Sequence, residues 1–143
     1  MTYRPYSAFT SPSLDYIRTN TTGVTINKGT PIRMNNAGDP DFVDPSIESE
    51  IIGIAGIAQD SIPNGEKGIF VTSGKVTQLS VPFDFGDTIY ISKTGGLTNI
   101  QPSIGVDGFV DGDFIVMLGV IAKNEENPAL KDLILHIDII GQL

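Results

Sequence analysis

Apolar and polar residues alternate along most of the chain in short stretches that end at turn residues. Val24 and Ile26 alternate before an Asn-Lys-Gly turn, and Ile69 and Val71 alternate after a Pro-Asn-Gly turn. Stretches of this kind predict strands that cross a sheet and turn back. The predicted fold class is therefore all-β, a compact antiparallel β-barrel or β-sandwich.

Two segments are apolar on both faces. Residues 51–58 place glycines between aliphatic side chains, and residues 114–122 form the most apolar stretch of the chain. Both predict buried strands, and 114–122 is the candidate for the central strand. Residues 123–129 have room for one helical turn, and no segment has the length and period of an amphipathic helix.

The pattern divides the chain into an N-terminal arm, residues 1–20, and a single β domain, residues 21–143. Pro5 and Pro12 disfavour a helix in the arm. Its aromatic residues are candidate contacts with another protein, or else they pack locally: Tyr3, Tyr6 and Phe9. Residues 39–50 are acidic and contain two prolines, which predicts a solvated connection.

The C-terminal segment, residues 131–143, alternates with period two and predicts a last strand. This strand either completes the sheet, swaps onto a neighbouring subunit or anchors a fibre. One of its faces is a candidate protein-interaction surface, formed by Leu133, Leu135, Ile137 and Ile139.

Composition excludes several classes of function. Nine Lys and Arg against seventeen Asp and Glu give a net charge of −8, the wrong sign for gripping phosphates, so no nucleic-acid partner is expected. There is no cysteine, which excludes disulfides and thiolate metal sites. No apolar run reaches the length of a signal peptide or a membrane span, so we expect synthesis in the cytoplasm and no membrane partner.

Candidate chemistry is sparse. His136 is the only histidine, and Asp138 lies on the same face of its strand, as either a hydrogen-bonded pair or an ordinary surface pair. No nucleophile elbow or phosphate-binding loop occurs. We therefore expect no enzyme activity and no cofactor.

Two acidic clusters leave Ca²⁺ binding open. They are Asp107, Asp111 and Asp113 in one segment and Asp39, Asp41 and Asp44 in another. Ca²⁺ takes six to eight oxygen ligands, but Asp-rich glycine turns have the same composition without a metal. A Gly-Asp turn before a strand also occurs twice, at residues 86–91 and 112–117; common turn chemistry explains it, and no repeat architecture is predicted.

The order of these phrases resembles the small capsid decoration, or cement, proteins of tailed bacteriophages. The residues that carry the resemblance are 24–32, 52–55 with Asp60 and 65–66, 73–76, 85–91, 95–98 and 118–122. The resemblance implies a structural virion protein, made in the host cytoplasm, that sits as a homotrimer on the outer capsid surface. Its partner would be the major capsid protein, and it brings no catalytic residues.

Two other functions stay open. Similar phrases occur in phage fibre modules, so the chain is alternatively a tail, baseplate or head-fibre module that binds a host-surface glycan or another virion protein. Its sugar-stacking residues would then be Tyr16, Phe83 or Tyr90. A hydrolase that uses dispersed carboxylates is the third possibility.

Overall fold

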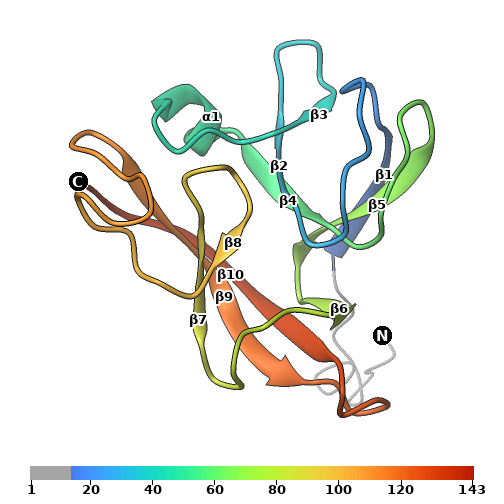
Figure 1. Cartoon of the computed structure of the whole chain (residues 1–143). Coiled ribbons are helices and arrows are strands. Elements are labelled where there is room, and N and C mark those ends of the chain that lie inside the picture. The colour runs from blue at the N-terminus through green and yellow to red at the C-terminus, as the bar shows by residue number, and fades with distance from the viewer. Residues whose placement is uncertain (1–13) are drawn as a thin grey trace, which may run out of the picture.

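The computed structural model describes residues 14–143, which form two five-stranded antiparallel sheets (Figure 1). In spatial order the first sheet consists of β1 (Leu14–Thr19), β5 (Lys67–Ser73), β4 (Ile54–Ala58), β2 (Pro31–Met34) and β3 (Pro40–Asp41). The second consists of β6 (Lys75–Leu79), β10 (Lys131–Gln142), β9 (Phe114–Lys123), β7 (Thr88–Ile91) and β8 (Leu97–Thr98). The predicted all-β class is confirmed.

The two sheets have the same topology. The order β6-β10-β9-β7-β8 reproduces β1-β5-β4-β2-β3, each strand being replaced by the one five places later. The registers also correspond, because β2 meets β4 at Ile32 and Gly56, and β7 meets β9 at Ile89 and Gly119. An irregularity follows directly after Ile32 in one sheet and after Ile89 in the other. The chain is therefore two copies of one five-stranded unit, residues 14–73 and 75–142.

This repeat differs from the echo noted in the sequence. Residues 86–91 and 112–117 fall on β7 and β9, which are not equivalent strands. Equivalent turns use different residue types: the amide of Gly38 donates to the carbonyl of Asn35, and that of Gly95 donates to the carbonyl of Ser92. The interpretation of that echo as common turn chemistry therefore stands, and the repeat that the structure shows is one of backbone geometry, which the side chains do not share.

Each unit depends on one glycine where two strands approach closely. Gly56 and Gly119 have φ of 156° and 157°. A Cβ on Gly56 would lie 2.7 Å from the Val71 carbonyl oxygen, and one on Gly119 would lie 1.9 Å from the Ile134 carbonyl oxygen. Both contacts are with backbone, which cannot swing away as a side chain can. Both positions therefore require glycine.

The core is shared between the units. The larger cluster joins side chains of the first unit to the second: Val43, Ile51, Ile57, Val71, Val76, Leu79, Phe83, Ile89, Ile91, Val116, Leu118, Ile121 and Leu133. A smaller cluster lies within the first unit: Ile26, Ile32, Ala58, Ile62 and Phe70. Tyr16 covers it, with its ring stacked 5.5 Å from that of Phe70. Burying apolar area on this scale is the main stabilising contribution to the fold.

Three segments differ from their sequence predictions. Leu14–Thr19 fall within the predicted arm, residues 1–20, but pair with β5, so the first sheet begins at Leu14. A short helix, α1 (Glu48–Ile52), occupies the end of the predicted connection 39–50 and the start of the predicted strand 51–58. Pro40–Asp41 form the short edge strand β3. Residues 1–13, with Tyr3, Tyr6 and Phe9, lie outside the described residues.

α1 is one turn long. Within residues 14–143 no helix has the length and apolar character needed to cross a membrane.

Candidate interaction surface

The C-terminal strand completes the second sheet, because β10 lies between β6 and β9 of its own chain. One face of β10 therefore covers the core. Leu133 is fully buried, and Leu135 and Ile137 pack partly against the core cluster. Of the four predicted interaction residues only Ile139 is exposed, at 43%. The opposite face of the strand exposes Ile134, which is not among the predicted interaction residues.

Exposed apolar side chains are concentrated on two long loops. They are residues 42–53, between β3 and β4, and residues 99–113, between β8 and β9, so they are equivalent in the two units. Of the sixteen exposed large apolar side chains in the described part, seven lie on these loops: Phe42, Ile47, Ile52, Ile100, Ile104, Val106 and Val110. Single exposed apolar residues are ordinary, and their concentration on two adjoining loops makes these loops the candidate interaction surface.

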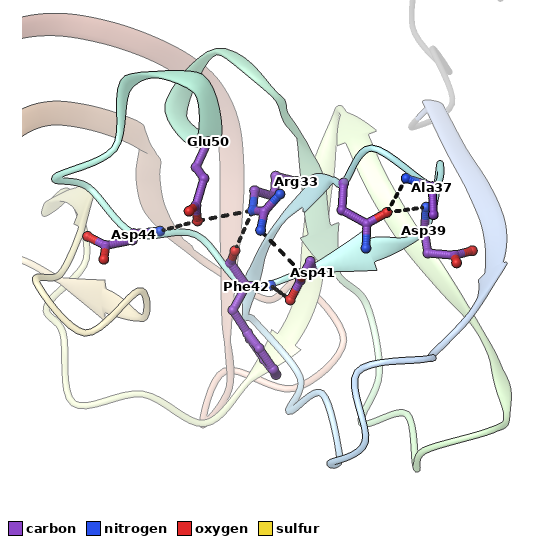
Figure 2. A network of polar contacts seen from close by, with 8 residues as sticks. Arg33, Ala37, Asp39, Asp41, Phe42, Asp44 and Glu50 are labelled. Atoms are coloured by element: carbon purple, nitrogen blue, oxygen red, sulfur yellow. Dashed lines mark hydrogen bonds and ion pairs between the residues drawn. The ribbon is translucent and has the colours of Figure 1, made fainter.

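An arginine holds the first loop. The Arg33 guanidinium on β2 contacts Asp41 at 3.3 Å and Glu50 at 3.0 Å, and its Nε donates to the Phe42 carbonyl (Figure 2). Glu50 in turn accepts a hydrogen bond from the Asp44 amide. The Arg33 and Glu50 side chains are 20% and 17% exposed, so water screens this network only partly. It fixes both ends of the loop to one strand.

A buried ion pair holds the second loop. The Lys93 ammonium lies 2.6 Å from Asp113 Oδ2, and the same oxygen accepts the amide of Val110 at 2.9 Å. The Asp113 side chain is 1% exposed and that of Lys93 is 28% exposed. Phe109 is also buried and anchors the middle of the loop. The exposed aliphatic side chains on this loop therefore project from a fixed backbone.

Backbone contacts bring the two loops and the C-terminus together. The Phe114 amide donates to the Pro45 carbonyl, and the Gly112 amide donates to the Leu143 carbonyl. The turn at Gly95 approaches the first loop so closely that a Cβ there would lie 2.5 Å from the Val43 carbonyl oxygen. Figure 1 shows α1 and the C-terminus on the same side of the molecule. We call the exposed apolar residues of both loops, together with Ile139 and Ile140, the loop surface.

Two carboxylates beside these loops have lowered pKa values. Hydrogen bonds from the hydroxyl and amide of Ser46 lower the pKa of Asp44, and Lys93 adds a smaller favourable charge. Hydrogen bonds from the Asn99 side chain and the Asp84 amide lower the pKa of Asp87. Hydrogen bonding to the ionised form is the main cause in both cases. These carboxylates stay charged and keep their turns closed.

Carboxylates of the two predicted calcium clusters take part in ion pairs within the chain. Asp113 is paired with Lys93 and Asp41 with Arg33, so each cluster has one carboxylate engaged by a cation of the chain. Within residues 14–143 no three His, Asp or Glu side chains converge as metal ligands. His136 and Asp138 are both exposed on β10.

An open hollow of about 270 Å³ adjoins the second loop and is lined by Ser92, Lys93, Thr94, Leu97, Thr98, Asp107 and Phe109.

None of the predicted sugar-stacking residues is fully exposed. Phe83 is in the core, Tyr16 stacks on Phe70, and Tyr90 is half-buried on β7. No family model, no curated protein and no solved structure matches this chain. What the residues themselves provide is a rigid, largely aliphatic surface on two braced loops, which is suited to packing against another protein.

Proposed function

We propose that this chain is a structural virion protein that decorates the outer surface of the major capsid lattice and stabilises the head without covalent bonds. The observation that carries the proposal is the loop surface, whose exposed aliphatic side chains project from loops held by ion pairs. A rigid apolar surface loses little conformational entropy on binding. The resemblance to capsid decoration proteins supplies the partner, and the proposal gives the chain no catalytic role.

The energy available suits a protein that acts in many copies. Fully burying one exposed Val or Ile side chain contributes about 1.5–3 kcal/mol, and a half-exposed one contributes less. The nine residues of the loop surface then offer roughly 5–10 kcal/mol per copy before the costs of association. A net charge of −8 keeps such a protein soluble and away from packaged DNA. Each copy stabilises modestly, and the effect sums over the lattice.

The alternative is a glycan-binding module of a tail, baseplate or head fibre. It has less support, since Phe83 is enclosed in the core and Tyr16 and Tyr90 are only partly exposed. Copy number separates the two functions: hundreds of copies per particle favour decoration, and a few copies at one vertex favour the tail or a fibre.

The experiment uses a matched pair of substitutions. Val110 on the loop surface is 54% exposed, and Val24, in the β1–β2 connection, is 56% exposed. Purified full-length protein is mixed with expanded capsids that lack it, and co-sedimentation is measured. We expect wild type and Val24→Asp to bind, and Val110→Asp to bind at least tenfold more weakly. Failure of the wild-type protein to sediment with capsids would overturn the proposal, and equal binding by both variants would remove the loop surface from it.

A further inference from the structure

The outer face of the second sheet has an equivalent in the first sheet. In the first sheet a row of paired residues runs Asp15, Val71, Ile57 and Pro31 across β1, β5, β4 and β2. In the second sheet the corresponding row runs Lys75, Ile134, Val120 and Thr88 across β6, β10, β9 and β7. Because the registers agree, Ile134 and Val120 occupy the positions of Val71 and Ile57.

The equivalent pairs differ in what covers them. Ile57 and Val71 are 0% and 2% exposed, because the second unit packs over them within the shared core. Val120 and Ile134 are 41% and 50% exposed. Two β-branched aliphatic residues, directly paired at the centre of a four-strand row, thus face solvent on one sheet while their counterparts are buried on the other.

Both exposed residues point the same way. Their chain neighbours Ile121 and Leu133 are paired and buried in the core, and successive side chains of a strand point to opposite faces. Met117, in the next row, is paired with Tyr90 and Asp138, and both Met117 and Tyr90 are half-buried. We call this surface the open face: Lys75, Thr88, Tyr90, Met117, Val120, Ile134 and Asp138.

We propose that the open face is covered by the open face of a second copy of this chain, related by a two-fold axis. In the first unit the same face of the same fold is covered by a sheet of this chain. The face that covers it is the core side of the second sheet. A neighbouring copy cannot offer that side, because it is already packed against the first sheet of its own chain. The corresponding side of its first sheet, with Ile32, Ala58 and Phe70, is closed and fully buried. Ile17 and Ile69, paired on the first sheet, are also exposed, but only the open face occupies the position that a sheet of this chain covers in the other unit. A contact between two identical open faces is a two-fold contact.

The size of the face predicts a weak dimer. Four strands span about 19 Å, and the ten residues of β9 span about 33 Å. The open face covers only part of this rectangle, so it buries at most about 600 Å² per copy, at the low end for specific interfaces, and we expect a weak, concentration-dependent dimer. This contact uses a different surface from the loop surface, so it does not rest on the proposed function. It does not generate the homotrimer that the resemblance implies, because a two-fold contact closes after two copies.

The test is the oligomeric state of the purified full-length chain by sedimentation velocity, from about 1 to 500 µM. We expect a monomer–dimer equilibrium for wild type and a dimer Kd raised at least tenfold by Ile134→Asp. Ile17→Asp is the control, since Ile17 is a strand residue that is 59% exposed on the first sheet; it should leave the Kd unchanged. A monomer throughout, a trimer, or an Ile134→Asp variant that dimerises like wild type would each overturn the proposal.

A second measurement guards against misfolding of that variant. The chain contains no cysteine, so a single introduced thiol is a clean probe. Under mild oxidation Val120→Cys and Ile134→Cys should give disulfide-linked dimers, at least tenfold faster than Ile17→Cys. Equal rates at the three positions would contradict the two-fold contact even if Ile134→Asp failed to fold.

Discussion

Replacing Lys93 by methionine tests whether the buried ion pair holds the second loop. The substitution keeps the length of the side chain but removes the ammonium 2.6 Å from Asp113, whose side chain is 1% exposed. Removing one partner of a buried pair costs about 3–5 kcal/mol, because the other charge is left uncompensated. Lys93 is 28% exposed, so water offsets part of its loss, and we expect a cost of about 3 kcal/mol. For a chain of this size that corresponds to a melting temperature lower by roughly 6–12 °C.

Urea unfolding followed by circular dichroism measures this cost, with Lys75→Met as the matched control. Lys75 lies 3.9 Å from Asp132 but is 55% exposed, so its loss should cost less than about 1 kcal/mol. Adding Asp113→Asn to Lys93→Met should recover about 1–2 kcal/mol, since it removes the unpaired charge. Two results would refute this reasoning about the pair. One is a free energy of unfolding for Lys93→Met within 0.5 kcal/mol of wild type, and the other is a loss in the double variant equal to the sum of the losses in the two single variants.

Three further predictions concern the fold and its pH dependence. Asn20 is fully buried, and its side chain donates to the carbonyls of Val24 and Ile62, so Asn20→Ala should lower the free energy of unfolding by about 2–3 kcal/mol in urea titration. Gly119→Ala should cost about 3 kcal/mol or more and exceed Gly56→Ala, because its Cβ would lie closer to backbone; equal melting temperatures would contradict this. Because the pKa values of Asp44 and Asp87 are lowered in the folded state, both carboxylates stabilise the fold above pH 3.8, and this stabilisation is lost as the pH falls below that value. Urea unfolding at a series of acid pH values should show the loss, and Asp44→Asn should make the loss smaller.

Period-two alternation was enough to predict the class of the fold. Side chains of a strand alternate between two faces, so a sheet that is covered on one face shows alternating apolar and polar residues along each strand. The turns at Gly29, Gly38, Gly86 and Gly95 have positive φ, which glycine adopts at little cost. These are local constraints, and the sequence shows them directly. The prediction of β1 as part of an arm failed for the complementary reason, since its partner β5 is far along the chain.

The candidate site was less accessible to sequence reasoning. The alternation in β10 identifies two faces but not which one meets the core, and three of the predicted interaction residues, Leu133, Leu135 and Ile137, lie on the buried side. The repeat was hidden as well, because its units share hydrogen-bond geometry while Asn35 is replaced by Ser92. The strand register and the backbone turns are the same in both units, but the residue types at equivalent positions differ.

By itself the sequence determined that this chain is all-β, acidic, free of cysteine and built from short strands joined by glycine turns. Only the tertiary structure decided that it is two copies of one unit, that the loops 42–53 and 99–113 adjoin, and that Val120 and Ile134 stay exposed where Ile57 and Val71 are buried. The physical reason is that local sequence fixes backbone conformation and the periodicity of faces. Which face is covered depends on packing between residues that are distant along the chain.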